Sequence, residues 1–326
     1  MTDTSVLSPK KPSRLGLYIV PGFILVLGIA VSIWWVAATR VADAGFDRWL
    51  ANEASLGRQW SCASRSMAGY PFRIELRCDG LTMSAEKGEL RAVSLGGFLA
   101  LAQIYNPKLV LVDVNGPMSA RLANGQTASI SWKTMRSSLH FETPLRADRA
   151  SWVIDGAVLE TSNPLVVGKL GHAEFHMRKI DGEANAPSDV ETVITASDAS
   201  LRDAQTTGSL DAHVITKKGS LLAENPGPSS FENWRASGGE ILIDQWDMKR
   251  GEQALALKGS LSLDETHRLN GKIDFSATGL GETLKESGLS ILGGSIGAGS
   301  VKLPLTLNKG RVLIGPLKLA EIPPLY

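Results

Sequence analysis

Residues 60–83 read WSCASRSMAGYPFRIELRCDGLTM, and this stretch decides the fold class of the chain. Gly69-Tyr70-Pro71 is a turn signal. Directly after it, apolar residues alternate with charged ones, as Phe72, Ile74 and Leu76 against Arg73, Glu75 and Arg77. Because successive side chains of a strand point to opposite faces, this pattern predicts a strand with one buried face and one solvated face.

Cys62 and Cys78 are the two cysteines of the chain and flank that turn. A second strand near residues 60–65 is expected to return antiparallel, so that a Cys62–Cys78 disulfide would join the pair. Zinc binding is the alternative. It would leave half of a tetrahedral site without protein ligands, since the first histidine is His140. The pattern therefore favours a structural disulfide, with no metal and no cofactor.

The alternation continues toward the C-terminus, broken by short turns such as Asn124-Gly125. Strands are expected at 90–95, 108–114, 118–122, 128–133, 137–142, 151–160, 171–180, 190–197, 207–216, 240–246, 254–263, 269–277, 299–307 and 310–319. Asn115-Gly116-Pro117 should end one of them, and residues 279–288 are expected to form one short helix. The sequence predicts a mainly β fold, either one long, curled antiparallel sheet or two stacked sheets.

Toward the N-terminus, residues 15–38 (LGLYIVPGFILVLGIAVSIWWVAA) contain no charged side chain. At a rise of about 1.5 Å per residue the segment is roughly 36 Å long, enough to cross a membrane. Lys10, Lys11 and Arg14 precede it, so the positive-inside rule keeps the N-terminus in the cytoplasm. Trp34 and Trp35 place the outer boundary of the span near Ala37.

A cleavable signal peptide is the competing interpretation, because Val36-Ala37-Ala38 and Ala42-Asp43-Ala44 both offer small residues. The apolar run exceeds the ~7–15 residues of a signal-peptide core, which favours an uncleaved anchor. Under either interpretation, the residues after the span are exported.

The regions expected along the chain differ in composition. They are a cytoplasmic tail (1–14), a transmembrane signal anchor (15–38), an amphipathic helix (39–59), an exported β region with the disulfide hairpin (60–222), a loop or boundary (223–239) and a C-terminal β region (240–326). The apolar stripe of the amphipathic helix, Phe46, Trp49, Leu50 and Ala54, is expected to pack on the domain that follows.

Lys and Arg together number 34 and Asp and Glu together number 33. This balance gives no electrostatic basis for binding nucleic acid along the whole chain. Ser295 lies in a G-x-S-x-G pattern, but the acid and histidine partners that a serine hydrolase needs do not follow it. We expect no enzymatic activity.

His172 and His176 are four positions apart, a spacing that can suit zinc. They lack the H-E-x-x-H order of a metalloprotease, and two histidines do not complete a site. The pattern favours two histidines on the surface of a strand.

Four elements resemble a known family of membrane-anchored, exported Gram-negative proteins, the domain-of-unknown-function family numbered twenty-one twenty-five. They are the N-terminal anchor, W-x-C…GYPFRIELRC, QIYNP…NGP at 103–117, and GSLSLD…LNGKIDF at 259–275. That family has no assigned activity, so the resemblance implies a fold and not a reaction.

The last ~60 residues are also similar to the C-terminal pattern of AsmA-type envelope proteins, in the spacing G-x-L-x-L-D then L-x-G-x-I-x-F and in the ending PLTLNKGRVLIGPLKLAEIPPLY. That resemblance implies an open β groove and a role in lipid transport at the envelope. We expect a single-pass inner-membrane protein with a periplasmic domain that binds or passes phospholipid along an apolar groove. The alternative is a non-catalytic scaffold that binds other envelope proteins.

Overall fold

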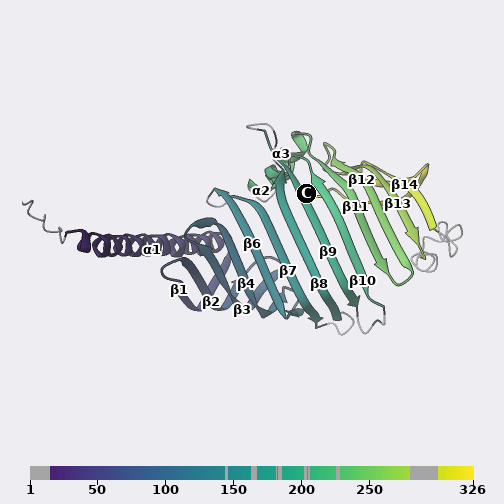
Figure 1. Ribbon diagram of the computed structural model, residues 1–326. Coiled ribbons are helices and arrows are strands. Elements are labelled where there is room, and N and C mark those ends of the chain that lie inside the picture. The colour runs from purple at the N-terminus through teal and green to yellow at the C-terminus, as the bar shows by residue number, and fades with distance from the viewer. Residues whose placement is uncertain are drawn as a thin grey trace, which may run out of the picture.

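The protein is one large antiparallel β sheet preceded by one long helix, as seen in a computed structural model that describes residues 15–143, 146–162, 167–180, 182, 186–201, 204, 206–224, 228–279 and 300–326 (Figure 1). The helices are α1 (Leu15–Ser55), α2 (Ser220–Glu224) and α3 (Pro228–Ala236). The strands are β1 (Arg58–Ala68), β2 (Arg73–Ala85), β3 (Leu90–Gln103), β4 (Asn106–Leu122), β5 (Thr127–Ser131), β6 (Thr134–Thr143), β7 (Arg146–Thr161), β8 (Val167–Ile180), β9 (Asp189–Leu201), β10 (Gly208–Thr216), β11 (Glu240–Arg250), β12 (Gln253–Leu263), β13 (Leu269–Thr278), β14 (Ser300–Asn308), β15 (Arg311–Ile314) and β16 (Leu317–Glu321).

Neighbouring strands in the sequence are neighbours in the sheet, with one local exception. The sheet has 16 strands in the order β1 to β16. The exception is that β5 and β6 together occupy the one position between β4 and β7, end to end, and each pairs with both of these strands. Such a meander needs only short turns between strands, as the many turn signals in the sequence predict.

The strands line up so that their apolar residues form continuous rows across the sheet. One such row, which we call the apolar row, runs through direct cross-strand partners from β2 to β14. It consists of Leu76, Ala100, Val112, Ser137, Trp152, Phe175, Ile194, Ala212, Trp246, Leu257, Phe275 and Leu303. None of these side chains is exposed, whereas the next row along the strands is mostly polar, from Arg77 to Lys302. The sheet therefore has one apolar face and one polar face.

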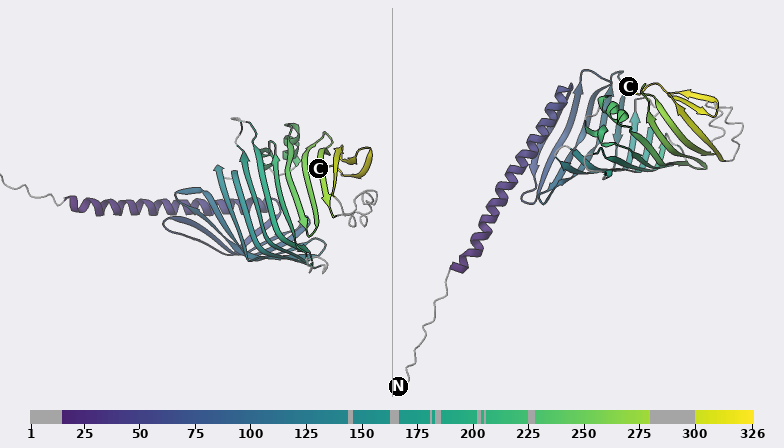
Figure 2. Two further views of the ribbon diagram at one scale, coloured as in Figure 1. Left: turned by 45° about the vertical axis from the view of Figure 1, so that its right-hand side comes forward. Right: turned by 90° about the horizontal axis from the view of Figure 1, so that it is seen from above.

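The sheet curls along its length into an open trough, which Figure 2 shows from above. The curled single sheet, one of the two architectures expected from the sequence, is thus the one observed. Twist accumulates at every strand pair, and register shifts in several pairs, such as β3 with β4 and β11 with β12, increase it locally.

Two strand boundaries differ from those expected. Asn115-Gly116-Pro117 was expected to end a strand, but β4 continues through it to Leu122. The register of β3 with β4 shifts between Leu95 and Gly97, opposite this segment, and a bulge tolerates a proline that cannot donate a ladder hydrogen bond. At the C-terminus, the single strand expected at 310–319 is two strands, β15 and β16, because a turn at Gly315-Pro316 divides it.

The segment 223–239, expected as a loop or boundary, contains α3 and does not divide the sheet. β10 and β11 lie on either side of it and pair directly, from Gly208↔Arg250 to Thr216↔Ile241. Trp234 of α3 is 3% exposed, and its indole Nε1 donates to the carbonyl oxygen of Lys217 at 2.7 Å. The helix expected at 279–288 falls almost wholly outside the described residues.

Helix α1 runs without a break through the apolar segment 15–38 and the amphipathic segment that follows it. It ends at Ser55 because Gly57 adopts a left-handed conformation with φ of 80°, which residues other than glycine rarely adopt. Arg58 and Gln59, expected in the helix, instead begin β1 and pair with Ala85 and Ser84.

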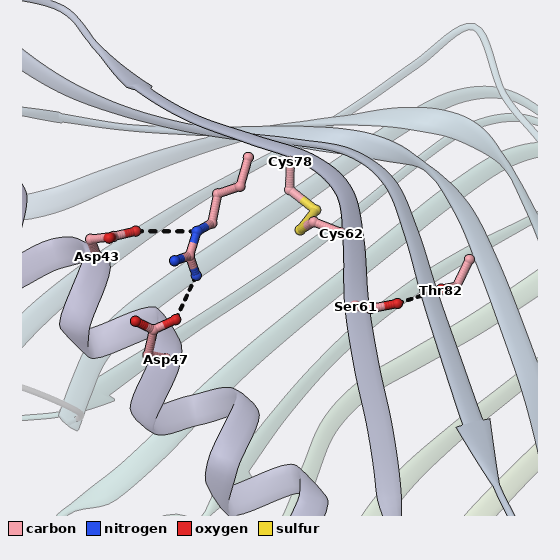
Figure 3. Close-up of a disulfide and its surroundings, with 7 residues drawn as sticks. Asp43, Asp47, Ser61, Cys62, Cys78 and Thr82 are labelled. Atoms are coloured by element: carbon pink, nitrogen blue, oxygen red, sulfur yellow. Dashed lines mark hydrogen bonds and ion pairs between the residues drawn. A yellow bond between two sulfur atoms is a disulfide. The ribbon is translucent and has the colours of Figure 1, made fainter.

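The last turns of α1 pack on the first strands of the sheet. The ring of Phe46 lies 6.0 Å from that of Phe98, and the ring of Trp49 lies 5.6 Å from that of Trp60. Asp43 and Asp47 face β1 beside the disulfide (Figure 3), where both pair with Arg65 at 3.2 and 2.6 Å. The stripe is therefore a packing surface for the sheet.

The hairpin of β1 and β2 carries the predicted disulfide. Cys62 and Cys78 are bonded, with their Cα atoms 5.6 Å apart, and Cys78 is fully buried. Phe72, which was expected on the buried face of the strand, is instead 67% exposed. It belongs to the turn, because β2 begins only at Arg73.

Candidate functional site

The apolar face of the sheet contains a hollow of about 670 Å³, which we call the apolar groove. It extends across β5 and β7 to β12. Its lining consists of Ile130, Ala157, Leu159, Gly168, Lys169, Leu170, Ala196, Ala199, Ser200, Leu201, Gly208, Ser209, Leu210, Met248, Lys249, Arg250, Gln253, Ala254 and Leu255. The volume is within the range of ~300–1,000 Å³ that is usual for sites that bind small organic molecules.

The strand register explains how the groove forms. Leu210 pairs with Ala196 on one side and with Met248 on the other, and Met248 pairs with Leu255. These four residues are displaced by two positions from members of the apolar row, so they lie on the same face. Alanine and glycine at many of the lining positions leave the space that larger side chains would fill.

The groove is open to solvent and is not a closed core. Met248 is 47% exposed and Leu201 is 65% exposed, although both side chains are large and apolar. An apolar surface of this extent that remains uncovered is typical of a site that binds an apolar ligand or a partner.

The charged side chains that line the groove are all cationic. Lys169, Lys249 and Arg250 contribute to it, and no carboxylate is present among the lining residues in the described part of the chain. Lys249 and Arg250 are exposed at the end of β11. The groove thus combines an apolar floor with a positive rim, which suits an amphiphile that has an apolar chain and an anionic head.

The polar face holds the two histidines that the sequence analysis considered for zinc. His172 and His176 both bond through Nε2 to the carboxylate of Glu174, at 2.9 and 2.7 Å. Their Nδ1 atoms contact Asp155 at 2.7 Å and the hydroxyl of Ser151 at 2.9 Å. The histidines are partly exposed strand residues, as expected, and the described residues contain no cluster able to hold a metal ion.

Hydrogen bonds shift the pKa values of this ladder in opposite directions. The bond from Asp155, supplemented by that from Glu174, raises the pKa of His172. The bonds from His176 and His172 lower the pKa of Glu174. Both shifts favour the charged forms of these two groups. The bonds of His172 to Asp155 and of His176 to Ser151 connect β8 to β7.

The remaining candidates lie apart from the groove or outside the described structure. Cys62 and Cys78 join β1 and β2, which do not line the groove. Ser295 lies outside the described residues. Not every member of the apolar row lines the groove: Phe275 of β13 belongs to the row but lies outside the groove.

The sequence did not identify the groove residues as a group. Alternation marked the apolar face of each strand, including Leu210 and Leu255. The hollow depends on which small residues become neighbours across strands that are far apart in the sequence, and no local pattern contains that information.

These features define a class: proteins with one helix that is long and apolar enough to cross a membrane, followed by a curled antiparallel sheet with an apolar face. The family described as "Uncharacterized protein conserved in bacteria (DUF2125)" matches residues 34–323, and the chain belongs to this family. This confirms the family resemblance seen in the sequence. Comparison with curated proteins and with solved structures gave no match.

Proposed function

We propose that this protein is a single-pass inner-membrane protein whose periplasmic sheet holds phospholipid in the apolar groove. The observation that carries the proposal is the open, apolar lining across β5 and β7 to β12, with cationic side chains at its rim. An acyl chain would lie on the leucine and alanine floor, and the phosphate would lie near Lys249 and Arg250.

The proposed location is supported by the chain itself. α1 is compatible with a single-pass anchor, and Lys10, Lys11 and Arg14 before it favour a cytoplasmic N-terminus. A disulfide agrees with an oxidising compartment for the sheet. The C-terminal sequence pattern, which resembles that of AsmA-type envelope proteins, is a further reason to propose lipid binding or transfer without catalysis.

A scaffold that binds other envelope proteins is the second candidate. β16 ends the sheet, and its outer edge is without a strand partner in the described part of the chain. A partner protein could add a strand to such an edge. This function would not require a ligand in the groove.

A photo-crosslinking experiment on the full chain tests the lipid proposal. A photoreactive phenylalanine at Leu210 places the reactive group in the groove, and the same residue at Asp211 places it on the opposite face of β10. In cells with radiolabelled phospholipid, we expect a lipid adduct at position 210 and none at 211. Equal labelling at both positions, or labelling at neither, would contradict the proposal.

A charged substitution in the groove provides a second test of the lipid proposal with the same crosslinking measurement. Met248→Asp adds a carboxylate where the side chain is already 47% exposed, so folding does not require burial of that charge. A carboxylate against an acyl chain costs more than about 1.4 kcal/mol, so the adduct at 210 should fall roughly tenfold or more. Gln245→Asp, which lies on the polar face, should leave the adduct unchanged.

A further inference from the structure

The turn between β1 and β2 lies against the apolar part of α1. The hydroxyls of Tyr70 and Ser32 are 2.8 Å apart, and the indole Nε1 of Trp35 donates to the carbonyl of Arg73 at 2.8 Å. The rings of Trp35 and Tyr70 meet edge to face with centroids 5.5 Å apart. These contacts hold the turn beside the segment Ser32–Trp35.

The segment Ser32–Trp35 of α1 lies within the predicted membrane span. A span needs about 20 residues to cross a hydrocarbon core of ~30 Å, so one that begins at Leu15 reaches Trp34. Ser32 precedes the boundary expected near Ala37 by five residues, about 7.5 Å along a helix. A turn bonded to Ser32 therefore reaches the outer layer of the same membrane.

Exposed aromatic residues occupy the two turns at this end of the first four strands, between β1 and β2 and between β3 and β4. Tyr70 is 59% exposed, Phe72 is 67% exposed and Tyr105, in the turn between β3 and β4, is 75% exposed. The two turns are neighbours, because the amide of Ile104 donates to the carbonyl of Phe72 at 3.1 Å. Arg73 and Lys108, both exposed, flank the aromatic residues.

We propose that Tyr70, Phe72 and Tyr105 form a membrane-contacting lip that enters the headgroup layer of the leaflet from which α1 emerges. Aromatic rings with nearby cations are characteristic of side chains at that depth, where the rings meet acyl chains and the cations meet phosphates. The lip adds a second point of membrane attachment and so fixes the orientation of the sheet relative to the bilayer. The proposal rests on α1 spanning the membrane and does not depend on what occupies the groove.

The depth of single spin labels tests the lip. Phe72→Cys and Tyr105→Cys provide unique attachment sites, because the structure contains no free cysteine among its described residues. The full chain would be reconstituted into vesicles of phosphatidylethanolamine and phosphatidylglycerol. Collision rates of each label with oxygen, which partitions into lipid, and with a water-soluble nickel chelate would then be measured.

Two matched sites calibrate the result. Lys87 lies in the turn between β2 and β3, at the opposite end of the same strands. A spin label on Lys87→Cys should collide with the nickel chelate as often as a label in water. Leu27→Cys, in the middle of the apolar segment, should show oxygen access typical of the bilayer. We expect labels at 72 and 105 to favour oxygen by several-fold relative to the label at 87.

Two results would overturn the proposal. Labels at 72 and 105 that behave like the label at 87 would show that the lip lies in water. A label at 27 with nickel access typical of water would show that α1 does not span the membrane, which removes the premise. Phe72 and Tyr105 are both mostly exposed, so their replacement removes little packing, and circular dichroism can verify that the variants are folded.

Discussion

The carbonyl oxygen of Ser260 in β12 lies so close to Gly271 of β13 that a Cβ added to this glycine would be 2.0 Å from it. The relationship is reciprocal across the hairpin. A Cβ on Gly259 would be 2.1 Å from the carbonyl oxygen of Lys272. Gly271 also has a φ of 150°, in the region that favours glycine. The two glycines of the repeated GSLSLD and LNGKIDF elements thus permit close approach of two backbones.

Gly271→Ala should therefore destabilise the sheet. Backbone strain and overlap with Ser260 together are expected to lower the free energy of unfolding by about 2–4 kcal/mol. Urea unfolding of the full chain in detergent, followed by circular dichroism, measures the change.

Gly45→Ala is the control for that substitution. Gly45 is helical, and a Cβ there would meet no atom within 4 Å, so the variant should be as stable as the parent or more stable by ~0.5–1 kcal/mol. An unchanged unfolding midpoint for Gly271→Ala would contradict the close approach of β12 and β13.

The disulfide should contribute measurably to stability. It closes a loop with a sequence separation of 16, for which the chain-entropy model gives roughly 3 kcal/mol. Replacing Cys62 and Cys78 by serine should lower the free energy of unfolding by about that amount. Ser61→Ala, in the same hairpin, removes only an exposed hydroxyl contact with Thr82 and should change it by less than about 0.5 kcal/mol.

Thiol labelling provides a direct measurement of the same bond. The unfolded, unreduced full chain should take up no label and should be labelled at both cysteines after reduction. Labelling of both cysteines before reduction would contradict the bond between β1 and β2.

His213 should make stability depend on pH. Its ring lies between Glu191 of β9 at 2.8 Å and Asp244 of β11 at 3.2 Å, and those carboxylates also pair with Arg178 and Lys258. The bond from Glu191, more than that from Asp244, raises the pKa of His213 above 6.5. The resulting stabilisation is complete below the unfolded pKa and is lost as the pH rises through the folded one.

Urea midpoints at about pH 5.5 and about pH 8.5 test this dependence. At the lower pH the parent should have a higher urea midpoint than His213→Gln. At the higher pH the midpoints of the two proteins should be nearly equal. His172 also has a raised pKa, so the variant should retain part of the pH dependence. A constant difference between parent and variant across the range would refute the role of His213.

Local pattern predicted much of the fold. Phe275 and Trp246 alternate with polar neighbours along their strands, and each lies on the apolar face, as a period of two requires. The alternation gave a wrong prediction for Phe72, which continues the apolar period of the strand but belongs to the turn and is exposed. Local pattern also failed where a bulge allowed a strand to continue, as at Gly116-Pro117.

The sequence by itself determined three features of this protein: one long apolar helix, many antiparallel strands with one apolar face each, and the pairing of its two cysteines. These features depend on hydrophobic length, on side-chain alternation and on cysteine number, which are all readable along the chain.

Only the tertiary structure decided that the apolar faces form one open trough and that a hollow lies between β5 and β12. The physical reason is that twist and register shifts accumulate over many strand pairs, so the curvature of the sheet is not a property of any single strand. The groove likewise brings together Ile130 and Leu255, whose proximity depends on every strand between them. The contact of Tyr70 with Ser32 has the same origin, because the first hairpin returns along α1.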